Sequence, residues 1–132
     1  MKNHVSHFEI YADDPDALVR FYSALFDWKI ELPMGPDDYR LVRTVDTDPT
    51  NGRPREVGGI NGGILKRSQK NGPRVIHYIT VDELDGAVDK AQSLGARLEK
   101  KRTAVPRMGW YALLTDPQGN PFALWQTDSN AI

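Results

Sequence analysis

The 132-residue sequence contains no cysteine. Disulfide frameworks, thiolate zinc sites and cysteine nucleophiles are therefore excluded. An excess of either charge is also missing, because 17 lysines and arginines stand against 18 aspartates and glutamates, a formal net charge of −1. A chain with this balance creates no field that would gather nucleic acid or anionic lipid. We therefore expect neither a nucleic-acid partner nor a membrane partner.

Long apolar runs and the common catalytic motifs are absent as well. No run approaches the roughly 18 apolar residues of a membrane span, and the N-terminal residues reach a strand pattern without an apolar signal segment. We therefore expect a cytoplasmic protein. The sequence has no nucleophile elbow and no Walker loop, and the glycines at 58–63 lead into a strand rather than a helix, so they form no phosphate cradle.

What the chain does contain is an internal repeat. Residues 6–11 and 75–81 each form a short alternating segment that carries a histidine, and an acidic turn and an amphipathic helical pattern follow each of them. His7 and His77 are 77 − 7 = 70 residues apart, whereas Leu25 and Leu94 are 94 − 25 = 69 apart. A one-residue deletion in the second strand–helix turn would reconcile the two values, and the repeat would then match His7 with His77.

The periodicity predicts the same order of elements in both halves, βαβββ. In the first half we expect strands at 5–11, 28–32, 39–45 and 56–65, a helix from 14 to 26, a loop at 33–36 and a hairpin at 46–55. In the second half we expect strands at 75–81, 97–101, 110–115 and 121–126 and a helix from 82 to 94. Asp82 is the expected cap of this helix, and Gly95 its stop.

These halves are too small to be robust alone, since a module of about 60 residues buries little surface. We therefore predict one α+β domain over residues 1–132, with module one at about 1–66, a polar linker at about 67–73 and module two at about 74–127. The tail from 127 to 132 carries no clear pattern, and we expect it to fray unless it reaches a neighbouring subunit.

Three features together resemble the vicinal oxygen chelate superfamily, which includes glyoxalase I, bleomycin-resistance proteins and extradiol dioxygenases. They are the paired βαβββ modules with an early histidine, the Phe21-Tyr22 pair before Phe26-Asp27-Trp28, and the run from Asp116 to Trp125. The resemblance is to small glyoxalase-like members and spans nearly the whole chain. It implies a curved, cup-like mixed sheet with helices on the outside, and a homodimer.

In metal-using members the resemblance implies four ligands, on the first and fourth strands of the two modules. His7 and His77 match the first-strand positions, but Ala123 replaces the usual glutamate in module two. Module one offers only Asn61 among glycines. A divalent centre needs about three protein ligands. We therefore expect no intrinsic metal, while the spacing leaves open a site made by His7, Glu9 and His77, with the blander alternative that His7 and Glu9 hydrogen-bond each other or a ligand.

Two tryptophans and an arginine complete the candidate site. Trp110 and Trp125 lie on the predicted third and fourth strands of module two, and Trp125 shares the parity of Ala123, which would point both into the cup. They would suit a flat or apolar ligand, or they fill the core or a dimer seam. Arg107 would sit at the rim and clamp a carboxylate or phosphate, or it is one solvated arginine among many. His4, near the chain end, receives no role.

The resemblance and the residues together predict a protein that binds a small organic molecule in a cup between the modules. We expect substrate-binding roles for His7, Glu9, His77, Trp110 and Trp125. If the protein is an enzyme, the resemblance implies a lyase, isomerase or dioxygenase, either with a metal or with Glu9 or a histidine as general base. The alternatives are a non-catalytic binding or resistance protein that holds an aromatic compound between tryptophans, and an assembly or regulatory module.

Overall fold

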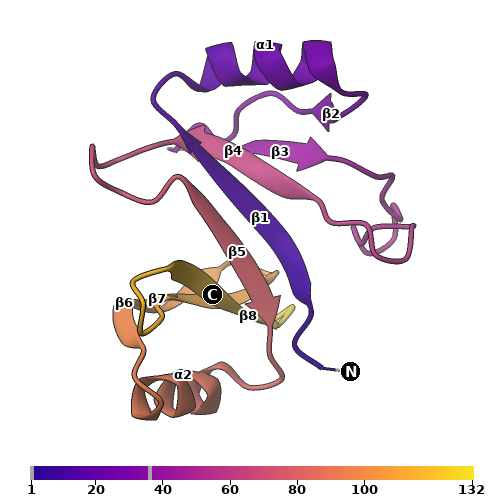
Figure 1. Ribbon diagram of the computed structural model, residues 1–132. Helices are drawn as coiled ribbons and strands as arrows, with labels where there is room; N and C mark the ends of the chain where they lie inside the picture. The colour runs from indigo at the N-terminus through magenta and orange to yellow at the C-terminus, as the bar shows by residue number, and fades with distance from the viewer. Residues whose placement is uncertain (1, 36) are drawn as a thin grey trace. The chain divides into compact units, whose positions relative to one another are not determined.

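The computed structural model describes residues 2–35 and 37–132 (Figure 1). Two compact units make up the chain: an N-terminal unit, His7–Val75, and a C-terminal unit, Ile76–Ile132 together with the residues up to Ser6. Of the predicted loop at 33–36, Pro36 lies outside the described residues, as does Met1. Among the described residues, neither helix has the length and apolar character needed to cross a membrane.

The N-terminal unit has the predicted βαβββ order. Its elements are β1 (Val5–Ala12), α1 (Pro15–Leu25), β2 (Lys29–Ile30), β3 (Arg40–Arg43) and β4 (Gly62–Lys66). The strands lie in the order β2-β3-β4-β1, with β1 parallel to β4 and the other pairs antiparallel. The first and fourth strands of the module are therefore neighbours.

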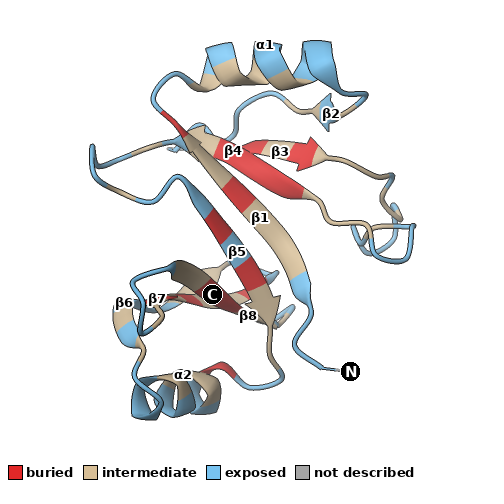
Figure 2. Cartoon of the chain, viewed as in Figure 1, coloured by how far each residue is buried: buried red, intermediate tan, exposed pale blue. Residues whose placement is uncertain are grey.

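The α1 helix begins and ends where the sequence predicts. Asp14 caps it by accepting a hydrogen bond from the Ala17 amide at 3.2 Å, and Pro15 occupies the first helical position. One face of the helix packs on β1, β3 and β4, because Ala12, Val42 and Ile64 form a buried cluster against Leu18 and Tyr22. In Figure 2 the buried segments of this unit lie on its strands, while the outer side of α1 is exposed.

The C-terminal unit repeats the order with β5 (Val75–Thr80), α2 (Leu84–Ser93), β6 (Arg97–Val105), β7 (Gly109–Thr115) and β8 (Pro121–Thr127). The strands lie in the order β5-β8-β7-β6, again with one parallel pair, β5 and β8. Leu84, Ala112, Leu114 and Leu124 form the buried cluster beneath α2. The α+β class and the mixture of parallel and antiparallel strands are confirmed.

The register of the repeat differs from the expectation. The two helix caps are Asp14 and Glu83, and 83 − 14 = 69, so the strand–helix turn has no deletion. With this offset His77 matches Phe8 rather than His7. The cap of α2 is therefore Glu83, which accepts from the Gly86 amide at 2.6 Å, and the predicted cap Asp82 instead pairs with Lys2 at 3.2 Å on the surface.

Two further segments differ from the sequence prediction, whereas the 46–55 hairpin is confirmed by an antiparallel bridge between Thr47 and Pro54. The strand expected from residue 56 begins only at Gly62. The tail is held rather than frayed. Ala131 is fully buried and its carbonyl accepts from the Arg107 amide at 2.8 Å, so residues 128–131 pack on the turn before β7.

Candidate functional site

A cluster of polar side chains occupies the face of β1 that points away from α1. Phe8 and Ile10 pack into the α1 core, so the alternation of the strand places His7, Glu9 and Tyr11 on the other face. Glu9 is buried, with 8% of its surface exposed, which is unusual for a carboxylate. A buried carboxylate needs donors around it, and its neighbours supply them.

Tyr39 joins this cluster from the segment just before β3. Its ring lies over Gly63, which pairs with Glu9 in the parallel β1–β4 register. A Cβ at Gly63 would collide with the Tyr39 hydroxyl and the carbon that carries it. The glycine at position 63 of the fourth strand therefore leaves room for an aromatic side chain to lie directly on the sheet.

Hydrogen bonds connect the members of this cluster, which we call the Glu9 cluster: His7, Glu9, Tyr11 and Tyr39. The Tyr11 hydroxyl donates to Oε1 of Glu9 at 2.8 Å, and the Tyr39 hydroxyl lies 2.7 Å from Nε2 of His7. Tyr39 also lies close enough to Glu9 for the carboxylate to raise the pKa of the Tyr39 hydroxyl. Nε2 of His7 and Oε2 of Glu9 are 3.9 Å apart, so the short contact of His7 is with Tyr39, and the direct His7–Glu9 hydrogen bond, one of the two alternatives expected, is not formed.

Burial sets the protonation states in this cluster. It lowers the pKa of His7, and the negative charge of Glu9 only partly opposes this effect. Burial also raises the pKa of Tyr39, and the adjacent Glu9 carboxylate raises it further. Near neutral pH the cluster therefore holds a neutral imidazole and a phenol that keeps its proton.

The donors present do not fit a divalent metal. At the expected fourth-strand positions, Ala123 has no donor, and Oδ1 of Asn61 is already bound by the amides of Thr44 and Val45 at 2.8 and 3.1 Å. The hydroxyls of Tyr11 and Tyr39 already lie against the Glu9 carboxylate. No group of three or more histidine, aspartate or glutamate side chains that could hold a metal ion occurs in the described part of the chain.

His77 lies on the face of β5 that carries α2. It alternates with Tyr78, which pairs with Ala123, and it shares its parity with Ile79, which packs into the α2 cluster. The side chain is exposed. The repeat therefore does not give His77 the strand face that His7 has in the N-terminal unit.

The two tryptophans of the C-terminal unit occupy opposite faces of its sheet, contrary to the expectation that both line one surface. Trp110 packs against the α2 cluster, whereas Trp125 pairs with Tyr111 on the other face. For Trp110 the structure therefore supports the alternative that the ring fills the core. Trp125 retains the parity of Ala123, as the sequence indicates.

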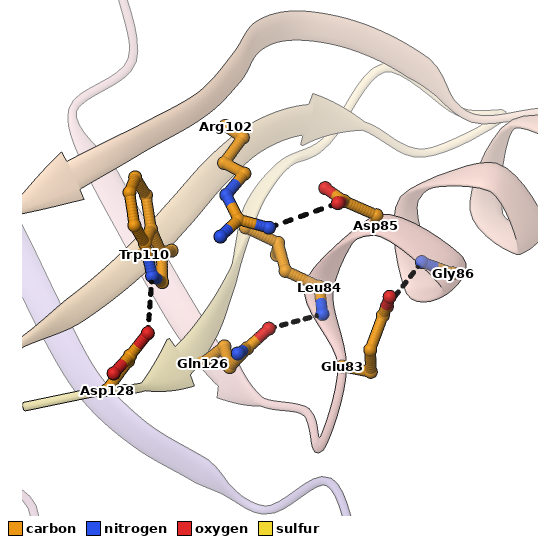
Figure 3. A network of polar contacts seen from close by, with 8 residues as sticks. All are labelled: Glu83, Leu84, Asp85, Gly86, Arg102, Trp110, Gln126 and Asp128. Carbon is orange, nitrogen blue, oxygen red and sulfur yellow. Dashed lines mark hydrogen bonds and ion pairs between the residues drawn. The ribbon is translucent and has the colours of Figure 1, made fainter. Parts of the chain in front are cut away.

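Trp110 is part of a polar network at the edge of the α2 core (Figure 3). The Arg102 guanidinium lies 4.1 Å from the centre of the indole ring and donates to Asp85 at 3.0 Å. The indole N–H donates to Oδ2 of Asp128 at 2.9 Å, and this hydrogen bond lowers the pKa of the Asp128 carboxyl. The network joins α2, β6, β7 and the tail, so it ties four elements of the C-terminal unit together.

Arg107 occupies the turn between β6 and β7 with a φ of 66°. Its side chain is exposed, and its backbone amide binds the tail at Ala131. The structure therefore assigns Arg107 a backbone role, and the anion clamp stays a prediction.

A hollow of about 400 Å³ lies in the N-terminal unit beside α1. Its lining includes Tyr11 of the Glu9 cluster together with Leu18, Phe21 and Arg74, but not the other three members of that cluster. The hollow is lined mainly by residues of the α1 side, whereas buried polar groups converge at the Glu9 cluster, which is therefore the candidate site.

Comparison with known proteins decides the family. A model of the glyoxalase-like domain matches residues 7–125. The chain belongs to this family. The predicted membership of the vicinal oxygen chelate superfamily is thus confirmed.

This glyoxalase-like chain has curated relatives in two mycobacteria. "Putative glyoxylase CFP32" of Mycobacterium bovis is 28% identical over 120 residues, and the protein of the same name in Mycobacterium tuberculosis matches equally. The match covers 88% of this chain and 41% of the relative. The chain therefore spans about two fifths of the length of these relatives.

Solved structures share the fold at low identity. A hypothetical protein from Bacillus halodurans has a TM-score of 0.67 at 12% identity, covering 100% of this chain and 99% of the other. A Streptomyces coelicolor methylmalonyl-CoA epimerase variant in complex with 2-nitronate-propionyl-CoA has a TM-score of 0.67 at 17% identity, with 100% and 99% covered. A glyoxalase/bleomycin resistance protein/dioxygenase superfamily member from Vibrio splendidus has a TM-score of 0.64 at 11% identity, with 96% and 100% covered.

Proposed function

We propose that this protein binds a small organic molecule at the Glu9 cluster and transfers a proton on it, as an isomerase or a lyase does. The contact of His7 with the Tyr39 hydroxyl, beside the buried Glu9 carboxylate, is the observation that carries the proposal. The structural neighbours include an epimerase, but at 17% identity they support the fold alone. The chemistry is therefore argued from the cluster.

His7 is the member placed to exchange a proton with a ligand. About a third of its side chain is exposed (33%), against 10% for Glu9. If the Tyr39 hydroxyl donates to Glu9, its oxygen accepts from Nε2–H of His7, and the basic lone pair of the ring is then on Nδ1. The lowered pKa keeps this imidazole neutral, which is the form that accepts a proton.

Glu9 and the two tyrosines act behind His7. When the ring takes up a proton, it becomes a cation, and the Glu9 carboxylate at 3.9 Å stabilises that charge. Tyr39 fixes the orientation of the ring through its 2.7 Å contact, and Tyr11 holds the carboxylate through its 2.8 Å hydrogen bond. A base held in this way is pre-oriented for proton abstraction next to a carbonyl group.

The test is hydrogen–deuterium exchange on small carbonyl compounds. The protein is incubated in D2O with a panel of 2-oxo acids, 2-hydroxy ketones and acyl thioesters, and NMR follows exchange at the carbon beside the carbonyl. We expect exchange on at least one class. We expect His7→Gln to reduce its rate by about 10²–10⁴-fold, the usual contribution of a general base.

Two further variants complete this experiment. Tyr39→Phe keeps the ring over Gly63 and removes only the hydroxyl, so we expect a smaller loss, whereas His4→Gln is the matched control, because that side chain is exposed and takes no part in the cluster. Equal losses in His4→Gln and His7→Gln would contradict the assignment of His7.

The second candidate function is binding without turnover. It is favoured by the burial of Glu9 and its hydrogen bond from Tyr11, because a rigid recognition site also needs a fixed polar group. A ligand held between two tryptophans is not supported, because Trp110 and Trp125 lie on opposite faces. Saturable binding of a panel member with no exchange would favour this candidate over the enzyme.

The assembly state is a separate proposal. We propose a homodimer on the strength of the superfamily resemblance and of the exposed aromatic side chains of α1 and its end, where Phe21 is 56% and Phe26 44% exposed. Light scattering at micromolar concentration tests this, and a monomer would contradict it.

A further inference from the structure

The C-terminal unit carries an aromatic surface on the side of its sheet that points away from α2. The register places Trp125 beside Tyr111 on β8 and β7, and Leu113 beside Lys100 on β7 and β6. Tyr78 extends the row on β5, with its ring centre 6.2 Å from that of Tyr111. We call the accessible part of this surface the Tyr111 face: Lys100, Thr103, Tyr111 and Trp125.

Trp125 lies flat on the sheet in this face. A Cβ at Gly109 would lie 2.5 Å from Cζ2 of the indole, so the ring rests where that side chain would be. The indole N–H donates to the Thr127 hydroxyl at 3.1 Å, which fixes the rotation of the ring. One face of the indole therefore covers backbone, and the other is directed away from the strand.

Lys100 places a positive charge directly over this aromatic surface. Its ammonium group donates to the Tyr111 hydroxyl at 2.7 Å and lies 5.1 Å from the centre of the Tyr111 ring. The two contacts hold the flexible lysine side chain above a ring instead of leaving it extended in water. An ammonium group has three donors, and the Tyr111 hydroxyl uses one of them.

The nearest carboxylate along the same strand does not neutralise Lys100. Glu99 accepts from Arg97 at 2.7 Å and from the Thr115 hydroxyl at 3.2 Å, and the Arg97–Thr115 pair lies at the other end of the β6–β7 ladder from Tyr111. The hydrogen bond from Arg97 lowers the pKa of Glu99, so this carboxyl remains ionised with its own partner. The charge of Lys100 is thus directed to the aromatic surface.

We propose that the Tyr111 face binds a flat aromatic anion, with its ring on Trp125 and Tyr111 and its anionic group on the Lys100 ammonium. Rings stack on rings, and a charge-assisted hydrogen bond fixes which end of the ligand lies at β6. The inference does not rest on the proposed function, because the Tyr111 face shares no residue with the Glu9 cluster. The inference names the chemical class of the ligand, an aryl carboxylate or sulfonate.

Two fluorescent probes test the inference directly. Anilinonaphthalene sulfonate is a flat aromatic anion, and N-phenylnaphthylamine has the same rings without the sulfonate. We expect the wild type to bind the sulfonate about tenfold more tightly than the neutral probe, the order of one charge-assisted hydrogen bond. Lys100→Met should remove this preference, and Lys100→Arg should keep it.

Matched controls locate the binding on this face. Lys101→Met removes the neighbouring exposed lysine of β6 and should change neither affinity, whereas Tyr111→Leu should weaken both probes. Phe21→Ser removes the exposed aromatic side chain of α1 and should have no effect. Thermal unfolding shows whether each variant is folded. If Tyr111→Leu is unfolded, the comparison of Lys100→Met with the wild type tests the inference instead.

Three results would overturn the inference: equal affinity of the wild type for the two probes, equal effects of Lys100→Met and Lys101→Met, or loss of sulfonate binding in Phe21→Ser alone. Proton exchange on carbonyl compounds is a separate readout. A wild type that prefers the sulfonate but catalyses no exchange contradicts only the proton-transfer proposal, and one that catalyses exchange without the preference contradicts only this inference.

Discussion

The ring of Tyr39 occupies the space that a side chain at Gly63 would need. This relationship places a phenol from the segment before β3 against a histidine and a carboxylate of β1. The Glu9 cluster therefore depends on the absence of a methyl group on β4.

Gly63→Ala should displace Tyr39 and open its contact with His7. Since the new methyl group collides with the ring carbon that bears the hydroxyl, we expect a loss of stability of about 1–3 kcal/mol, the usual cost of overpacking. Chemical denaturation measures the loss, and ring NMR signals of His7 report the broken contact. An unchanged imidazole signal would show that the phenol does not depend on this glycine.

Gly86→Ala should have the opposite effect. Gly86 lies in the first turn of α2, and a Cβ there would meet only the flexible end of Glu83, at 3.2 Å. Alanine restricts the unfolded chain more than glycine does, so we expect a gain of about 0.5–1 kcal/mol. The midpoint of urea unfolding checks this, and a loss of stability would mean that the Glu83 cap cannot adjust.

The stability of the fold should depend on His7 below pH 6.5. Burial lowers the pKa of His7 from its ordinary value of 6.5, so the unfolded chain takes up this proton first as the pH falls. The free energy of unfolding should therefore decrease from about pH 6.5 towards the acid side, ahead of the carboxyl range. His7→Gln should flatten that part of the curve, and His4→Gln should not. A curve with the same slope in both variants would contradict the lowered pKa.

Removal of residues 128–132 should destabilise the C-terminal unit. The deletion takes away the Asp128 partner of Trp110 and the fully buried Ala131. We expect a lower unfolding temperature and a shift in the fluorescence of Trp110 as water reaches its ring. Deletion of Ile132 alone, which is 93% exposed, is the control and should change neither. If both deletions behaved alike, the tail would not be part of the fold.

The periodicity of the sequence was sufficient for the order of elements but not for the register of the repeat. Strand alternation and the helix caps are local, so β1, α1 and the last three strands lie close to their predicted positions. The match between His7 and His77 was made because both residues are histidines. The packing gives a different register, because Ile10 and Ile79, which are 79 − 10 = 69 apart, both point to the helix of their unit.

Part of the candidate site could be predicted and part could not. The shared face of His7, Glu9 and Tyr11 follows from the two-residue period of a strand. Tyr39 does not follow, because it is 32 residues from His7 and its place depends on the pairing of Glu9 with Gly63. The glycine-rich strand was a signal that some group approaches the backbone closely, but the sequence does not say which group.

The first residues of the chain belong to the C-terminal unit, and this has a consequence for folding. His4 accepts from the amide of Thr80, and the hydroxyls of Ser6 and Thr80 are 2.7 Å apart across 74 positions of sequence. Closing so long a loop costs conformational entropy before any contact compensates it, which slows folding. During synthesis the segment up to Ser6 emerges long before its partner strand, so the C-terminal unit can be completed only after β5 has been made. A fragment that starts at Ile76 would lack this segment and would leave the Thr80 edge of β5 unpaired.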